Sequence, residues 1–331
     1  MCEACPLGFY QEHSGQLDCT PCPGFATTPD TGIPYHTMCL APESPGQYLL
    51  VANGQNTLTK THLAFQNESI INLSDITGSV THHFYSATDN FIYYSTQSPA
   101  SIRRIRWDGN LGLTIINLKG EEVTGLAVDE RSGLVFYTLR TGSLRAVTSD
   151  RYTEDDIVIL DGLNGTRDLV LHQETFMMYW SEGQTIQQYR YGNDSRTLLK
   201  NTGQDVLGLR LNPEVDRLMW YSNGQLMSCD TDGDDVTNLV DNASPLFGLV
   251  NDYYFYASET GLFRVNADGV TRAQVMSLTS PPTSVSVIST NHQDWGPLKC
   301  CGDVPYGQAC WQIDRFEIKR LGTDETHHDE V

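Results

Sequence analysis

The chain has 331 residues, of which 39% are hydrophobic and 10% aromatic, enough to form a packed core. Its net charge of −20 argues against nucleic acid and anionic lipid as partners, because both bind clustered basic residues. The charge is compatible with a basic protein ligand or simply with solubility, and no run of about 18 apolar residues predicts a membrane span.

Dense cysteines predict a separate module over residues 1–46. Cys2-x2-Cys5 and Cys19-x2-Cys22 have the spacing of a zinc ribbon, but a fifth cysteine, Cys39, has no role in a four-thiolate site. Small segments with many cysteines are usually stabilised by disulfides in an oxidising compartment. We therefore favour a disulfide-rich module over a zinc site. We also expect a secreted, extracellular chain whose signal peptide is absent from this sequence.

Two stretches of this module share one pattern, Cys-Pro followed by a Gly-aromatic pair and a loop that ends in Cys. They are CPLGFYQEHSGQLDC and CPGFATTPDTGIPYHTMC. The pattern resembles the ephrin-receptor-like, tumour-necrosis-factor-receptor-like and EGF-like modules of extracellular proteins. The resemblance implies the disulfides Cys5–Cys19 and Cys22–Cys39, each worth about 3 kcal/mol on the chain-entropy model. Cys2 then belongs to a preceding unit or is left over, and as an odd cysteine it is a candidate for a disulfide-linked oligomer.

Six aromatic-rich strands recur along residues 47–290 at a nearly constant interval. Their equivalent residues are Leu50, Tyr93, Phe136, Tyr179, Trp220 and Phe255. A period of about 40–45 residues with several strands per unit is typical of a β-propeller, in which each blade is one four-stranded sheet. The hairpins of the repeat contain Asp108-Gly109, Asp232-Gly233 and Asp268-Gly269, pairs that favour primed two-residue turns.

Three motifs in the repeat carry a family resemblance. They are Gly125–Asp129 (GLAVD), Tyr179–Glu182 (YWSE) and Gly261–Arg264 (GLFR). The repeat resembles the YWTD (class B) repeats of low-density-lipoprotein-receptor relatives, which implies an all-β, six-bladed propeller closed by a shared blade. Val285–Ile288 is then expected to be the innermost strand of the blade that begins with Leu49–Asn53, so that no free sheet edge remains.

Polar residues interrupt the apolar pattern of two innermost strands. Where one unit has Thr124-Gly125-Leu126, two others have Thr81-His82-His83 and Arg167-Asp168-Leu169. Innermost strands line the central channel, and ligands commonly bind at its mouth. The candidates for a catalytic cluster are His82, His83, Arg167, Asp168 and His172. The candidates for ligand contacts are His82, Arg167, Asp168 and Trp180. The alternative is that these side chains only pair with one another or with channel water.

The sequence offers weak support for metal or cofactor chemistry. His82 and His83 are adjacent on a strand and should point to opposite faces, so both are not expected to bind one ion. Asp230, Asp232 and Asp234 alternate as in a calcium loop, but a bidentate Glu and flanking helices are missing. We favour a solvated hairpin turn there and expect no cofactor, with Ca²⁺ as the alternative.

The C-terminal segment, residues 291–331, contains three of the nine cysteines. Cys310 is expected to pair with Cys300 or Cys301, and the residues beyond about Arg320 are expected to be disordered. Cys229, inside the repeat, has the pattern of a buried and inert thiol. Five sequons fit a secreted glycoprotein: Asn67, Asn72, Asn164, Asn193 and Asn242.

These features favour an extracellular ligand-binding or scaffold glycoprotein that uses the propeller face for protein recognition. Two alternatives are a secreted propeller enzyme with its site at the channel mouth and a structural matrix or coat glycoprotein. The sequence contains no Ser-His-Asp pattern or Gly-rich phosphate loop, so we expect binding rather than catalysis.

Overall fold

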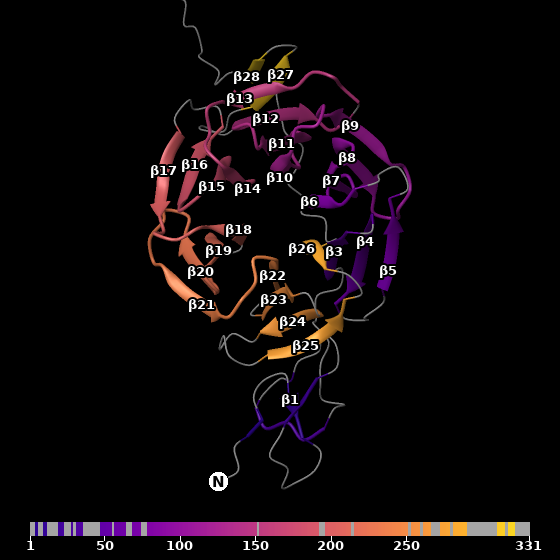
Figure 1. Ribbon diagram of the computed structural model, residues 1–331, viewed down its shortest axis with the longest axis vertical. Coiled ribbons are helices and arrows are strands. Elements are labelled where there is room, and N and C mark those ends of the chain that lie inside the picture. The colour runs from indigo at the N-terminus through magenta and orange to yellow at the C-terminus, as the bar shows by residue number, and fades with distance from the viewer. Residues whose placement is uncertain are drawn as a thin grey trace, which may run out of the picture.

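The computed structural model is all-β, with six four-stranded sheets arranged as the blades of a ring (Figure 1). It describes residues 4–5, 9–11, 19–22, 28, 31–35, 47–54, 56–63, 68–73, 78–150, 152–191, 196–212, 215–250, 253–258, 261–265, 272–278, 281–289, 310–314 and 317–321. None of these residues forms a helix, so no described helix could span a membrane. The six-bladed all-β fold expected from the repeat is confirmed.

Each sheet is antiparallel, and its strands run in order from the centre of the ring outwards. Blade 1 contains β26 (Pro282–Ser289), β3 (Gln47–Asn53), β4 (Thr57–His62) and β5 (Glu68–Asn72). Blade 2 contains β6 (Val80–Ser86), β7 (Phe91–Gln97), β8 (Ala100–Arg106) and β9 (Leu113–Asn117). Blade 3 contains β10 (Val123–Asp129), β11 (Leu134–Leu139), β12 (Ser143–Thr148) and β13 (Ile157–Leu160).

The remaining blades repeat this arrangement. Blade 4 contains β14 (Thr166–His172), β15 (Met177–Glu182), β16 (Thr185–Arg190) and β17 (Arg196–Asn201). Blade 5 contains β18 (Leu207–Asn212), β19 (Arg217–Ser222), β20 (Gln225–Asp230) and β21 (Thr237–Asp241). Blade 6 contains β22 (Phe247–Val250), β23 (Tyr253–Ser258), β24 (Gly261–Val265) and β25 (Arg272–Ser277). Two small pairs lie outside the blades: β1 (Phe9–Tyr10) with β2 (Thr20–Pro21), and β27 (Cys310–Asp314) with β28 (Glu317–Leu321).

The ring closes in blade 1, where the two ends of the repeat meet. β26 pairs antiparallel with β3, so that Val285 lies opposite Val51 and Val287 opposite Leu49. The closure expected for Val285–Ile288 is therefore confirmed. Each innermost strand also contacts the innermost strands of both neighbouring blades, which joins the six sheets into one ring.

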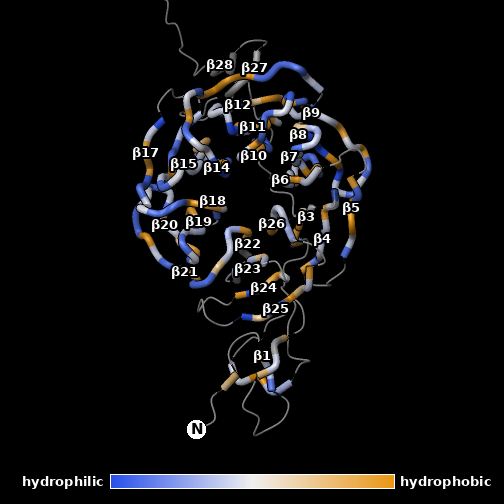
Figure 2. Tube along the Cα trace, viewed as in Figure 1, coloured by the Kyte–Doolittle hydropathy of each residue, from blue (hydrophilic) through white to orange (hydrophobic). Residues whose placement is uncertain are grey.

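The hydrophobic core lies between neighbouring blades. Every residue of β11 is buried, because both faces of this strand pack against another blade. Phe136 packs with Leu169 and Trp180 of blade 4, whereas Tyr137 packs with Tyr93 of blade 2. Hydrophobic segments are accordingly spread around the whole ring (Figure 2). The recurring aromatic strands thus supply the interfaces that hold the blades together.

The two rims of the ring are defined by the direction of the innermost strands. We call the rim where these strands begin the upper rim, and the rim where they end the lower rim. β10 begins at Val123 and ends at Asp129, and β14 begins at Thr166 and ends at His172. The turns between the second and third strands of each blade lie at the upper rim, because the strands are antiparallel.

At the lower rim, one position of the repeat links blades 3, 4 and 5 each to the preceding blade. The Glu130 Oε1 accepts a hydrogen bond from the Ala87 N–H at 2.6 Å, and the Gln173 Oε1 accepts one from the Glu130 N–H at 3.2 Å. The Asp216 Oδ1 lies 2.8 Å from the His172 Nε2. Glu130, Gln173 and Asp216 follow one another at steps of 43 residues, so the repeat itself places them.

Replacing Gln173 by alanine should lower the free energy of unfolding by about 1–3 kcal/mol, because it removes two hydrogen bonds to the backbone of blade 3. The Gln173 Nε2 also donates to the carbonyl oxygen of buried Val128 at 2.7 Å. The exposed Gln184 provides a matched control, and its replacement by alanine should change the free energy by less than about 0.5 kcal/mol. Urea denaturation of both variants checks this, and equal effects would contradict the linking role.

Candidate functional site

Three blades bring titratable side chains together near the centre of the ring. We call His82 and His83 of β6, Asp168 of β14 and Arg210 of β18 the axis cluster. The Arg210 Nη1 lies 3.7 Å from the Asp168 Oδ1, and the Arg210 guanidinium carbon lies 5.8 Å from the centre of the Phe247 ring in β22. Arg210 also acts electrostatically on both histidines of β6. Its side chain therefore interacts with blades 2, 4 and 6.

Asp168 occupies a backbone conformation that favours glycine. Its φ is +51°, and the ladder between β14 and β15 is irregular between Arg167 and Leu169. In blade 5 the ladder is irregular as well, and Gly208 takes a φ of +61° there. A left-handed conformation is uncommon for a residue other than glycine, although aspartate tolerates it better than most. Asp168 thus places a carboxylate beside Arg210 where another blade has only a glycine.

Burial lowers the pKa of both histidines. The pKa of His83 falls to about 3, through burial first and then through the charges of Arg210 and His82. The pKa of His82 is also lowered by burial and by Arg210, while Asp168 and Glu122 act in the opposite direction. Both imidazoles are therefore neutral near pH 7.

The two histidines face different blades. The Nδ1 of His82 lies 3.2 Å from the Thr81 Oγ1, and the backbone of Thr124 in blade 3 acts to raise the pKa of its ring. The Nε2 of His83 lies 2.6 Å from the Ser286 Oγ in blade 1. Their opposite directions agree with the expectation that they do not share one metal ion. No group of three or more His, Cys, Asp or Glu suited to a metal ion occurs in the described part of the chain.

The axis cluster has unused hydrogen-bonding capacity. The Arg210 Nη1 donates to the Leu209 carbonyl at 2.8 Å. Among the described residues, the Nδ1 of His83 and the Oγ1 of nearby Thr283 in β26 are buried and have no hydrogen-bond partner. Buried polar atoms normally have one, so these two atoms favour a polar ligand or ordered water at this position.

Arg210 was not among the site residues predicted from the sequence. The signal that could have found it is an arginine within an otherwise apolar innermost strand, LGLRLN. Such a strand is enclosed by its neighbours, and a cation there needs a partner. Its partner Asp168 belongs to another blade, so sequence spacing alone did not connect the two residues.

Not every expected site residue joins this cluster. Arg167 lies exposed at the upper rim, beside Asp168. His172 is buried at the lower rim, at the other end of β14, where it contacts Asp216. Trp180 is 0% exposed in the core between blades 3 and 4, and its Nε1 donates to Glu182. The expected ligand contact of Trp180 at the channel mouth is therefore overturned, because its ring is needed for packing.

The Asp230–Asp235 segment forms a hairpin turn stabilised from within. The Asp230 Oδ1 accepts hydrogen bonds from the N–H groups of Asp232 and Asp234, at 3.1 and 2.7 Å. Asp232 does not have a positive φ, whereas Gly233 has a φ of +87°. The turn is therefore not the primed type expected from Asp-Gly, which needs positive φ at both central residues. The Asp230 carboxylate is already used by the backbone, which favours a solvated turn.

The cysteines and sequons in the described residues fit an extracellular module. Cys5 and Cys19 form a disulfide with an S–S distance of 2.08 Å, as expected. Cys22 is also disulfide-bonded, but Cys39 lies outside the described residues, as do Cys2, Cys300 and Cys301. Cys229 is a free thiol in the core, and burial raises its pKa to about 11.

Three of the sequon asparagines are exposed: Asn72, Asn164 and Asn242. All three lie at the upper rim, Asn72 as the last residue of β5, Asn164 before β14 and Asn242 after β21. The other two, Asn67 and Asn193, lie outside the described residues. The described positions are therefore accessible to a glycosylating enzyme.

The N-terminal segment and the propeller resemble different known proteins. Residues 1–39 match the family model of tyrosine-protein kinase ephrin type A/B receptor-like segments. None of the curated proteins matches the sequence. A chain of a nidogen–laminin complex has a similar structure, with a TM-score of 0.63 and 13% identity, over 73% of this chain and 98% of that chain.

A second similar structure is TolB from Acinetobacter baumannii, with a TM-score of 0.62 and 12% identity. The match covers 73% of this chain and 66% of TolB. Identities this low support the fold alone. The chain therefore joins an ephrin-receptor-like segment to a six-bladed β-propeller with the fold of the chain in the nidogen–laminin complex.

Proposed function

We propose that this chain is an extracellular glycoprotein that binds a protein partner through the upper rim of its propeller. The observation that carries the proposal is the axis cluster, where the partly exposed Arg210 guanidinium lies 3.7 Å from the Asp168 carboxylate. The disulfide-bonded N-terminal segment supports an oxidising, extracellular location. The similar chain from a nidogen–laminin complex supports a protein as the partner.

The geometry favours binding over catalysis. His82 and His83 face different blades, and His172 lies at the opposite rim. A catalytic site needs its acid, base or nucleophile to converge on one reacting atom. The axis cluster instead offers a guanidinium and a carboxylate to polar groups of a partner. Such charged groups at an interface contribute mainly to specificity and to the rate of association.

Reversing one charge at the upper rim tests this proposal. We expect Arg167→Glu to weaken binding of the secreted chain to extracellular matrix deposited by cultured cells, since the change removes an exposed cation beside Asp168. The matched control is Arg190→Glu, because Arg190 is exposed at the lower rim end of β16. Binding is measured by immunodetection after washing.

The expected result is a loss of about tenfold, or 1.4 kcal/mol, for Arg167→Glu, with little change for Arg190→Glu. Equal losses for both variants would indicate a general charge effect and contradict an upper-rim site. Retention of the chain inside secretory cells with its disulfides intact would contradict the extracellular location.

A further inference from the structure

Tyr152 is an exposed tyrosine in the connection between β12 and β13, at the lower rim of blade 3. Its side chain is 45% exposed, and its hydroxyl donates only a long hydrogen bond of 3.4 Å to the Glu154 Oε1. Among the tyrosines that the structure describes, Tyr35 in the N-terminal segment is also exposed, at 57%. An enzyme acting on the folded protein reaches hydroxyls of this kind and not those of the buried tyrosines between the blades.

Carboxylates surround Tyr152 in the sequence and in the structure. The segment 150–156 contains Asp150, Glu154, Asp155 and Asp156 with one arginine. The first three of these acids are exposed, whereas Asp156 is paired with Arg145 at 3.1 Å. Tyr35 has no acidic residue within four positions on either side. The two exposed tyrosines therefore differ in charge environment and are a natural pair for comparison.

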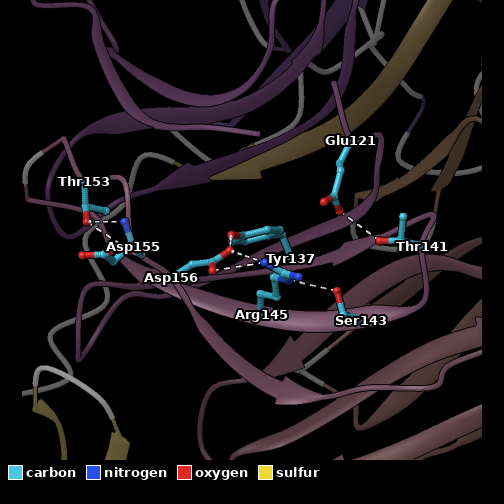
Figure 3. A network of polar contacts seen from close by, with 8 residues as sticks. All are labelled: Glu121, Tyr137, Thr141, Ser143, Arg145, Thr153, Asp155 and Asp156. Atoms are coloured by element: carbon cyan, nitrogen blue, oxygen red, sulfur yellow. Dashed lines mark hydrogen bonds and ion pairs between the residues drawn. The ribbon is translucent and has the colours of Figure 1, made fainter. Parts of the chain in front are cut away.

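The connection is held from its inner side (Figure 3). The Thr153 N–H donates to the Ile115 carbonyl at 2.8 Å, which attaches the segment to β9 of blade 2. The Thr153 Oγ1 and the backbone of Asp155 form a local turn, with bonds of 3.0 and 3.1 Å. Asp156 is bonded to Tyr137 and Arg145 of blade 3. These anchors fix the segment while Tyr152 and Glu154 stay exposed to solvent.

We propose that Tyr152 is a site of O-sulfation. The phenolic oxygen attacks the sulfur of 3′-phosphoadenylyl sulfate, a new O–S bond forms, and the bond to the adenosine bisphosphate leaving group breaks. The phenolic proton passes to a base of the transferase, and no oxidation or reduction occurs. The donor is a polyanion, so the transferase must present cationic groups near its active site, and these attract an acidic substrate segment. Asp150, Glu154 and Asp155 supply that charge.

Sulfation would create a binding site for a basic partner at the lower rim. It adds a permanent negative charge and new acceptor oxygens next to three exposed carboxylates, which suits arginine or lysine side chains of a basic partner. The site lies on the rim opposite the proposed upper-rim surface, so it is an additional contact. The inference rests on the proposed extracellular function only in that the chain must pass through the secretory route.

The test uses the purified full chain, a tyrosylprotein sulfotransferase and a radiolabelled sulfonate donor. We expect label on the natural chain, background label on Tyr152→Phe, and unchanged label on the matched control Tyr35→Phe. Glu154→Gln combined with Asp155→Asn should reduce the rate of labelling while Tyr152 is still present. An unlabelled natural chain, or full labelling of Tyr152→Phe, would overturn the proposal.

Secretory cells fed with radiolabelled sulfate provide the second arm. After enzymatic removal of N-glycans, label should remain on the secreted natural chain, resist phosphatase and be absent from Tyr152→Phe. Phosphatase-sensitive modification of Tyr152 would overturn sulfation in favour of phosphorylation. A secreted but unlabelled chain overturns sulfation alone. A chain that is not secreted overturns the proposed extracellular function. The assay with purified protein then shows independently whether Tyr152 is a substrate for sulfation.

Discussion

Replacing Trp180 by alanine should lower the free energy of unfolding by about 3–5 kcal/mol, because it opens a cavity between blades 3 and 4. Trp180 is 0% exposed and packs with Phe136, Leu169 and Met178. Its Nε1 donates to the Glu182 Oε1 at 2.9 Å, so the substitution also removes a hydrogen bond. Urea denaturation followed by circular dichroism measures the change.

The control for this variant is Tyr152→Ala, which truncates an exposed aromatic residue and should cost less than about 0.5 kcal/mol. If Trp180→Ala does not fold, Trp180→Phe should still show a smaller destabilisation in the same direction. Two alanine variants of equal stability would contradict the assignment of the core to the interfaces between blades.

Lowering the pH should destabilise the propeller in a way that depends on His83. Its pKa is about 3 in the folded protein and about 6.5 in an unfolded chain, so the unfolded state binds more protons between these values. Stability is therefore fully present above the unfolded pKa and falls by about 1.4 kcal/mol per pH unit below it. The shift of His82 acts in the same direction.

His83→Gln isolates this contribution, because the amide does not titrate and can still bond the Ser286 hydroxyl. The free energy of unfolding is measured in urea at pH 7, 6 and 5 for both proteins. The variant should show a shallower decline than the natural chain. Identical slopes would mean that His83 is not held neutral by the fold. The acid titration of surface carboxylates is common to both proteins and cancels in the comparison.

The sequence predicted the architecture because its determinants are repeated and local. Aromatic strands such as Leu134–Leu139 must bury both faces, and that requirement recurs in every unit. The closing strand was predictable since Val285–Ile288 had no aromatic strand after it within the repeat. Cys5–Cys19 followed from the family pattern and is present. The strands were predictable from a short sequence period, and the disulfide was predictable from the resemblance to a known cysteine-rich module.

The candidate site was predicted only in part, because it depends on contacts between distant blades. His82, His83 and Asp168 were found by their departure from the repeat, but Arg210 was not. Trp180 was misplaced, since its position on the second strand of a blade points it into an interface. His172 and Asp168 were predicted to belong to one cluster, but they lie near opposite ends of β14 and therefore near opposite rims.

Carboxyl footprinting of the secreted chain on cell-deposited matrix tests upper-rim recognition most directly. The exposed carboxylates Asp161 and Asp205 lie in connections at the upper rim, and Glu174 and Asp232 lie in connections at the lower rim. We expect binding to protect Asp161 and Asp205 from carbodiimide labelling and to leave Glu174 and Asp232 reactive. Protection of the lower-rim pair alone would contradict an upper-rim recognition surface.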